Sequence, residues 1–371
     1  MSPPTVRPEC AALGSELLAL GRRSGLADVG IASAGAFDSV RADLLERRER
    51  GLHGGMQFTY RNPARSTDPD RILPGAKALV VGAYGYRRGE GADGDPEPGA
   101  GRPVGVVARY ARSDHYASLR AGLAPIADRL RRQGWRAVVV CDDNALVDRA
   151  AAHRAGLGWF GKNSLILLPG LGSWFVLGSV VTDAPLPPSL AGDPPAPGAG
   201  CGSCDRCRTA CPTGALAEPG VLDARRCLAW LVQAPGPFPE EHRRALGGRI
   251  YGCDECQQVC PVNRLADRRR PAPPAEAGDM ASVDLLALLE ATDDELLATF
   301  GRWYVPARDP RYLRRNALVA LGNVGDPADP ATVACLRRWA GVGDELLAEH
   351  ARWAAGALGL EPDGPGPVGG P

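Results

Sequence analysis

The chain has 371 residues, and its 44% hydrophobic content is enough for buried cores in two or three domains. Its 43 basic and 43 acidic side chains cancel, so no global charge indicates a nucleic-acid-binding or membrane-binding protein. The first ten residues contain no apolar run, so we expect no signal peptide and a cytoplasmic location, where cysteines stay reduced.

Strands alternate with helices in the first half of the chain, which is typical of an α/β domain. In chain order we expect helix 11–20, strand 29–34, helix 38–50, an irregular segment before the turn at Pro74, strand 78–83, an exposed loop 87–103, a strand and a helix within 104–135, strand 136–141 and helix 145–155. Ser113 or Asp114 is the candidate N-cap of the helix that stops at Gly134. The irregular segment includes Arg65, and loops carry function more often than cores do.

Residues 163–182 form the longest uncharged run, about as long as a membrane span. Pro169 and the glycines beside it interrupt the run, so we expect two buried strands, 165–168 and 174–182, and no membrane association. The glycine-rich segment before Lys162 lacks the G-x4-G-K-[ST] pattern, so we do not expect a nucleotide-binding loop.

The segment between residues 201 and 261 carries eight of the eleven cysteines. It reads C-x2-C-x2-C-x3-C-P, then an isolated cysteine, then C-x2-C-x3-C-P, and Ile250 stands where the second run would have its first cysteine. The first run has the spacing of bacterial ferredoxins, in which the fourth cysteine ligates the other cluster. Counting ligands in this way gives two complete Cys₄ sites for two [4Fe-4S] clusters: Cys201, Cys204, Cys207 and Cys260 for one, and Cys211, Cys227, Cys253 and Cys256 for the other.

Structural zinc is the alternative interpretation, since zinc also takes C-x2-C pairs. Zinc ligands usually come as two separated pairs, whereas three cysteines here stand at i, i+3 and i+6, and each run ends in Cys-Pro. Disulfides are less expected, because nothing marks the chain as secreted.

Two proline-rich stretches, 185–200 and the one after Arg268, divide the chain into parts. We expect an α/β domain over 1–190, a ferredoxin-like double-cluster domain over 191–270, an α-helical domain over 275–362 and a disordered tail over 363–371. Segments 314–323 and 351–360 resemble each other, which predicts two helical hairpins of the HEAT type.

Several segments together resemble the epoxyqueuosine reductase family. They are RYARSDHY (109–116), VCDDNALVDRA (140–150), AGLGWFGKNS (155–164), GSWFVLG (172–178), the split cysteine motif with its isolated Cys227, and LRRNALVALGN (313–323). The cysteine spacing and the AGLGW-x-GKN pattern are the specific parts of this likeness, which covers roughly residues 20–360.

The resemblance implies reduction of the epoxide of epoxyqueuosine, at the wobble position of tRNA, to the alkene of queuosine. It also implies cobalamin bound without an axial histidine, and the chain has no D-x-H-x-x-G cobalamin box. Electrons from a flavodoxin- or ferredoxin-type donor would pass through the two clusters to cobalamin, and we expect a monomer.

The resemblance assigns the proton donor to Asp142, with Asp143 as the alternative. It assigns contacts with the cofactor to Arg65, Asp142, Lys162, Ser173, Cys253, Asp254, Glu255 and Cys256. Opening an epoxide requires an acid that is protonated at neutral pH, so we expect burial to raise the pKa of Asp142. The alternative role of Asp142 is the N-cap of the next helix, and that of Lys162 is a solvated loop charge.

A tRNA substrate also offers an interpretation of the helical domain. Its aromatic and basic side chains would either contact tRNA or form a solvated helix face, and they are Trp303, Arg302, Arg308, Arg311, Arg314 and Arg315.

Two other functions fit the residues: a reductive dehalogenase-like corrinoid enzyme, and a non-enzymatic iron–sulfur protein that carries electrons or binds tRNA. The missing export signal and the helical C-terminal part argue against the dehalogenase. The cobalamin content of the purified protein would separate an enzyme from an electron carrier.

Overall fold

The structure is a computed structural model and describes residues 8–87, 102–192, 194–196, 198–269 and 278–360. The predicted tail, and most of the predicted loop 87–103 and of the second linker, lie outside these residues. The chain groups into two compact units, the first made of Met1–Gly89, Asp114–Arg225 and Glu255–Pro273, and the second of Glu90–Ser113, Arg226–Asp254 and Pro274–Pro371. This grouping differs from three consecutive domains, because the cysteine-rich segment is divided between the two units.

A four-stranded sheet in the order β1-β2-β7-β4 lies at the centre of the first unit, and all its neighbouring strands are antiparallel. The strands of this unit are β1 (Asp28–Ser33), β2 (Ala78–Gly85), β4 (Ala137–Cys141), β7 (Phe175–Thr182), and the short pair β5 (Trp159–Phe160) and β6 (Ile166–Leu167). Nearly every residue of the central strands β2 and β7 is buried, as expected for continuous apolar runs that are covered on both faces. Val80 and Val139 both lie opposite Val180 in the register.

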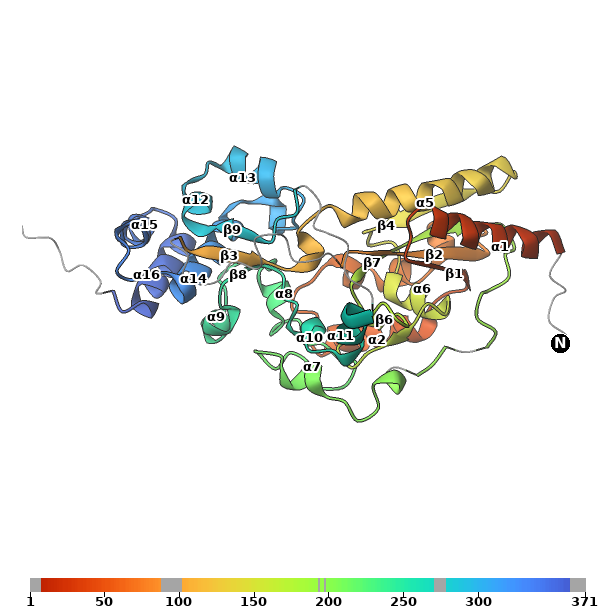
Figure 1. Ribbon diagram of the computed structural model, residues 1–371, viewed down its shortest axis with the longest axis horizontal. Helices are drawn as coiled ribbons and strands as arrows, with labels where there is room; N and C mark the ends of the chain where they lie inside the picture. The colour runs from red at the N-terminus through yellow and green to blue at the C-terminus, as the bar shows by residue number, and fades with distance from the viewer. Residues whose placement is uncertain (1–7, 88–101, 193, 197, 270–277, 361–371) are drawn as a thin grey trace, which may run out of the picture. The chain divides into compact units, whose positions relative to one another are not determined.

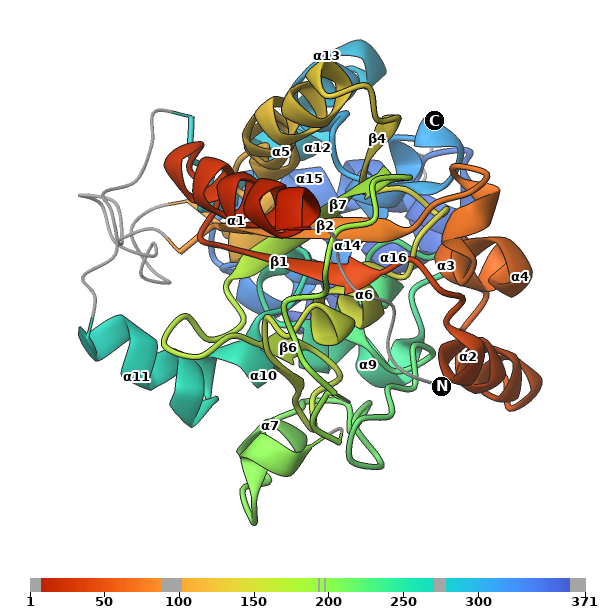
Figure 2. The same ribbon diagram turned by 90° about the vertical axis from the view of Figure 1, so that its right-hand side faces the viewer.

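Helices cover both faces of this sheet. Those of the first unit are α1 (Pro8–Arg23), α2 (Asp38–Glu49), α3 (Phe58–Arg61), α4 (Pro63–Ser66), η1 (Pro69–Arg71), α5 (His115–Arg132), α6 (Asp148–Arg154), η3 (Ala199–Cys201), α7 (Arg206–Thr209), α10 (Glu255–Gln258) and α11 (Pro261–Arg269). Figures 1 and 2 show α1 and α5 on one face of the sheet and α6 on the other. The Asp114 side chain accepts the Ala117 N–H at 2.9 Å, which confirms one of the two predicted N-caps of α5.

The uncharged run 163–182 forms β6 and β7 with a turn between them, as predicted. Among the helices that the structure describes, none is long and apolar enough to span a membrane.

The second unit combines a three-stranded sheet with a helical core. Its elements are β3 (Val104–Val107), η2 (Arg109–Ala111), α8 (Leu228–Leu231), α9 (Glu240–Leu246), β8 (Arg249–Tyr251), β9 (Ser282–Asp284), α12 (Leu285–Glu290), α13 (Asp293–Phe300), η4 (Pro306–Arg308), α14 (Arg311–Val324), α15 (Pro330–Ala340) and α16 (Glu345–Ala357). β3 pairs in parallel with β8 and antiparallel with β9, so the strand that the sequence placed in the α/β domain belongs to this sheet instead. α14 packs against α12 and α16, and α16 also packs against α15. The assignment of these helices to the HEAT type stays a prediction.

Candidate functional site

Four thiols of the first unit lie near one another. Cys201 ends η3, and the Cys204 N–H donates to the Cys201 carbonyl oxygen at 3.0 Å. Cys207 lies in α7, and Cys260 follows α10 in a buried position. Burial raises the pKa of Cys207, and the charges of Cys201, Cys260 and Cys204 raise it further, so the four sulfur atoms are close enough to interact electrostatically. These are the four cysteines that the sequence assigns to one cluster.

Across the described ranges, no three His, Cys, Asp or Glu side chains are placed as ligands of one metal ion. All eleven cysteines are free thiols.

The second predicted ligand set is divided between the two units. Cys211 and Cys256 belong to the first unit, and Cys227 and Cys253 to the second. The Cys211 sulfur accepts the Ala215 N–H at 3.2 Å, and Cys227 is the residue before α8. The assignment of these four thiols to one cluster stays a prediction.

A buried polar network holds the part of the second cysteine run that belongs to the first unit, with Cys256 and Cys260. Asn263 Oδ1 accepts the Ser173 N–H at 2.7 Å, and its Nδ2 donates to Ser173 Oγ at 3.0 Å and to the Gln257 carbonyl oxygen at 2.8 Å. Gln257 Nε2 donates to the carbonyl oxygen and to Oγ of Ser173, both at 3.0 Å. Because Gln257 lies between Cys256 and Cys260, this network fixes the segment that carries both thiols. The Ser173 hydroxyl is engaged within the network, and its predicted contact with a cofactor stays a prediction.

Gly172 makes this network possible, and its replacement provides a test. Its φ is 71°, and a Cβ there would lie 2.0 Å from Asn263 Oδ1. Gly172→Ala should therefore strain the backbone and displace Asn263, at a cost of roughly 3 kcal/mol in the free energy of unfolding, and should reduce the iron content. The measurements are denaturant unfolding and iron analysis.

Gly170 is the matched control in the same turn. Its φ is 72°, but no atom would lie within 4 Å of an added Cβ. Gly170→Ala should cost only about 1 kcal/mol, from the left-handed backbone alone. Equal losses in the two variants would contradict a role for the contact between Gly172 and Asn263.

The end of β4 carries the predicted proton donor. Asp142 has a φ of 53°, a left-handed conformation that is uncommon outside glycine and is often found at functional sites. The neighbouring Asp143 carboxylate accepts the Ala145 N–H at 2.8 Å. The N-cap of α6 is Val147, without a side-chain cap, so Asp142 is not the N-cap of this helix. The structure thus separates the two aspartates: Asp143 makes the local backbone hydrogen bond, and Asp142 does not.

Burial and neighbouring acids favour the protonated form of Asp142. Partial burial raises its pKa, Arg120 opposes the shift, and Asp114 and Asp143 add to it. Burial also raises the pKa of Asp148 well above its ordinary value, and Asp148 Oδ1 is buried without a hydrogen-bond partner. Asp142 still keeps exposed surface, so a substrate can reach its carboxyl group. Burial and neighbouring acids therefore favour the protonated form of Asp142 at the end of β4.

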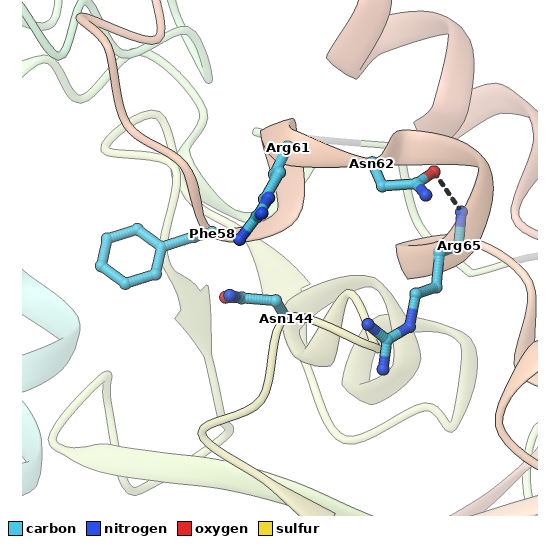
Figure 3. A pocket seen from close by; sticks show the side chains of 5 residues that line it. All are labelled: Phe58, Arg61, Asn62, Arg65 and Asn144. Atoms are coloured by element: carbon cyan, nitrogen blue, oxygen red, sulfur yellow. Dashed lines mark hydrogen bonds between the residues drawn. The ribbon is translucent and has the colours of Figure 1, made fainter.

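A cavity of about 430 Å³ lies beside this loop and is lined by Phe58, Arg61, Asn62, Arg65 and Asn144. Phe58 and Arg61 lie in α3, Arg65 lies in α4, and Asn62 lies between the two helices. Figure 3 shows Arg61 reaching toward Asn144, which follows Asp142 by two positions. Asn62 Oδ1 caps α4 by accepting the Arg65 N–H at 3.1 Å. Within the part of the chain that the structure describes, neither arginine has a carboxylate partner. Two unpaired guanidinium groups and two amides suit a ligand that carries phosphate and hydrogen-bonding groups.

The other residues predicted to contact a cofactor have protein partners of their own. Lys162 Nζ lies 3.2 Å from Asp205 Oδ1, and only 14% of its side chain is exposed, so it is not a solvated loop charge. In the second unit, Asp254 Oδ2 accepts the Arg109 N–H at 2.7 Å, while its buried Oδ1 has no partner among the described residues. Burial raises the pKa of Asp254. Glu255 begins α10. Contact of these residues with a cofactor stays a prediction.

The aromatic and basic side chains of the helical part stabilise the second unit itself. Trp303 is buried, and its Nε1 donates to a backbone carbonyl oxygen at 2.9 Å. Arg315 is fully buried and donates to three backbone carbonyl oxygens. Arg314 pairs with Asp293 at 2.5 Å, and the more exposed Arg311 pairs with two aspartates. Both interpretations of the set, as a solvated face or a tRNA face, are therefore wrong for Trp303, Arg314 and Arg315.

A family of known domains matches the cysteine-rich segment. The family is described as a 4Fe-4S double cluster binding domain, and it matches residues 200–263, which include all eight cysteines of the two predicted ligand sets. The match favours iron–sulfur clusters over structural zinc.

Two relatives that match most of the chain have the same name. Proteins named epoxyqueuosine reductase from Vibrio cholerae and Xanthomonas campestris are each 34% identical to this chain, over 314 and 368 residues. The alignments cover 82% and 97% of this chain, and 81% and 100% of the relatives. A solved epoxyqueuosine reductase with a tRNA-Tyr epoxyqueuosine-modified stem loop is 31% identical, has a TM-score of 0.82, and matches over 94% of this chain and 91% of that one. The structure from Streptococcus thermophilus is 29% identical with a TM-score of 0.81 over the same shares.

Proposed function

The chain belongs to the epoxyqueuosine reductase family, and we propose that it reduces the epoxide of epoxyqueuosine, at the wobble position of tRNA, to the alkene of queuosine. It is an oxidoreductase by this membership. Among this chain's own residues, those of the loop after β4 give the main support for the proposal. There an accessible acid of raised pKa stands beside a cavity with two unpaired arginines.

The reaction requires two electrons and two protons, and it releases the epoxide oxygen as water. The two proposed [4Fe-4S] clusters would deliver the electrons one at a time, held by Cys201, Cys204, Cys207 and Cys260, and by Cys211, Cys227, Cys253 and Cys256. Cobalamin, when bound, supplies a low-valent cobalt centre that can act on the substrate carbon. The match to a double-cluster domain supports the cluster part of this proposal.

Several residues predicted to contact the cofactor have polar side chains that suit a corrin ring, whose rim carries amide groups. Among the residues that the structure describes, the Arg65 guanidinium group has no partner, and neither has the buried acceptor Asp254 Oδ1. We assign cofactor contacts to these two, to Lys162 and Ser173, and to the remaining residues of the Cys253–Cys256 loop, Cys253, Glu255 and Cys256. The role of these residues is to hold and orient the cofactor.

Asp142 is the proposed general acid. Its protonated carboxyl group would donate to the oxygen that leaves the carbon, which removes the cost of releasing an alkoxide. Asp114 and Asp143 support this state, because nearby carboxylates disfavour ionisation of Asp142. A catalytic loop that carries an aspartate is described as swung out of the active site in the solved Bacillus subtilis epoxyqueuosine reductase, 30% identical to this chain.

The proposed macromolecular substrate is tRNA that carries epoxyqueuosine, and the stem-loop complex of a relative supports it. Arg61 and Asn144 both line the cavity, which supports a contact of the guanidinium group with a phosphate and of the amide with the nucleoside beside it. We further propose a flavodoxin- or ferredoxin-type electron donor, a monomeric enzyme and a cytoplasmic location, where tRNA is modified.

Replacing Arg61 tests the tRNA proposal. Arg61→Gln should weaken tRNA binding and lower the slope of log K against log salt by about one, because one phosphate contact is lost. Arg311→Gln is the control, since Arg311 already pairs with Asp309 and Asp344. An unchanged slope in Arg61→Gln, measured by filter binding at several salt concentrations, would remove Arg61 from the tRNA site.

The direct test of function is anaerobic incubation of the reconstituted protein with tRNA from cells that lack it. Nucleoside mass spectrometry should show epoxyqueuosine converted to queuosine. A protein that purifies without corrin and leaves epoxyqueuosine intact would instead be an electron carrier. A protein that acts only on organohalides would be a dehalogenase.

A further inference from the structure

The indole ring of Trp159 packs against the loop that carries Cys201. β5 holds this loop through the Gly198 N–H, which donates to the Phe160 carbonyl oxygen at 2.7 Å. A Cβ added to Gly200 would lie 2.3 Å from Trp159 Nε1 and 2.4 Å from Cε2. The nitrogen edge of the indole therefore lies against the backbone of the residue directly before Cys201, and only glycine leaves room for it there.

Trp159 Nε1 is buried and has no hydrogen-bond partner among the residues that the structure describes. An indole N–H can only donate, and a buried donor without an acceptor is costly, so such groups are usually paired in folded proteins. This orphan donor lies at the point where the matched double-cluster domain begins, residue 200.

A hydrogen-bond acceptor is expected beside Trp159 Nε1. Cys201 directly follows Gly200 and is one of the four thiols assigned to one cluster, and a cluster bound there would bring both thiolate and sulfide sulfur atoms. These sulfurs carry negative charge, and hydrogen bonds to them are one of the factors that set the reduction potential of a cluster. The donor and the expected acceptor thus complement each other.

We propose that Trp159 Nε1–H donates a hydrogen bond to a sulfur of the cluster held by Cys201, Cys204, Cys207 and Cys260, and thereby raises its reduction potential. The inference rests on the iron–sulfur part of the proposed function. The reduced cluster carries one more negative charge than the oxidised cluster, so the N–H group stabilises the reduced state more strongly. Trp159 is a positioning and tuning residue, and it takes no part in proton transfer to the substrate.

Trp159→Phe keeps an aromatic ring but removes the donor. The equilibrium constant for reduction of this cluster should fall roughly tenfold, which corresponds to about 59 mV for a one-electron couple. The measurement is a redox titration of the reconstituted full chain followed by EPR, with iron analysis of each sample. Trp135→Phe is the control, because it removes an indole N–H after α5 in the same unit, far along the chain from every cysteine of the motif.

A second measurement does not depend on how well the variant assembles. In the reduced full-length protein labelled with ¹⁵N-tryptophan, pulsed EPR should show a ¹⁵N coupling to a cluster, and this coupling should persist in Trp135→Phe but be absent in Trp159→Phe. No ¹⁵N coupling in the wild type, or an unchanged potential in Trp159→Phe with full iron content, would overturn the proposal. A chain that binds no iron at all would contradict the proposed function itself, and iron analysis identifies that outcome separately.

Discussion

Asp142→Asn should lower turnover of epoxyqueuosine in tRNA by about 10²–10⁴-fold while the clusters, the cofactor and tRNA binding are retained, since an amide cannot replace a general acid. Asparagine tolerates the left-handed backbone that Asp142 adopts, with its φ of 53°, so the fold should not suffer. Single-turnover assays under anaerobic conditions, with nucleoside mass spectrometry as the readout, measure the effect. Unchanged turnover would remove Asp142 from the mechanism.

Asp143→Asn is the matched control. Its side-chain oxygen can still accept the Ala145 N–H, which Asp143 accepts at 2.8 Å, so turnover should stay near that of the wild type. If Asp143→Asn lost turnover and Asp142→Asn kept it, the acid would be Asp143.

The pH dependence follows from the direction of the pKa shift. An acid works only while it is protonated, and burial raises the pKa of Asp142, so the active range extends upward from the ordinary range of an aspartate. Turnover should fall as the pH rises through this raised pKa. The residual activity of Asp142→Asn should lack that decline.

Cys227→Ala should prevent proper assembly of one cluster, because no other cysteine in the motif is left to supply the fourth ligand. The ligand count predicts about eight iron atoms per chain, and the variant should hold about four, with electron transfer to the substrate lost. Iron analysis and EPR of the reduced protein measure the change.

Cys10→Ala is the control for the loss of a thiol, since Cys10 lies in α1 outside the cysteine motifs. Its iron content should equal that of the wild type. Two intact clusters in Cys227→Ala would disprove the ligand scheme. The proposed electron path through the second cluster would then lose its support.

Local patterns predicted many elements of this protein because their causes are local. β2 and β7 are apolar runs that end at turn residues, and Asp114 caps α5 through a side chain three residues from its partner. The cysteine spacing is equally local, since three thiols at i, i+3 and i+6 reach one cluster without help from distant residues. The likeness to the family rested on such patterns, and the whole-chain relatives confirm it.

Local sequence patterns did not predict the roles of residues whose partners lie far away in the chain. In the sequence, Asn263 and Gln257 are ordinary polar residues of a cysteine-rich segment. The structure shows that both form hydrogen bonds with Ser173. The cavity joins Arg61 with Asn144, which lie far apart in the sequence; the only local signal was the irregular segment before Pro74.

The sequence by itself determined the cysteine spacing, the central strands and the family, because each depends on residue types at short spacings. Only the tertiary structure decided that β3 pairs with β8 and β9, that Arg315 is buried against backbone carbonyl oxygens, and that Asp143 makes the backbone hydrogen bond beside Asp142. The physical reason is that strand pairing and the burial of a charge depend on which surfaces meet after the chain has folded. Neither is encoded in a short window of residues.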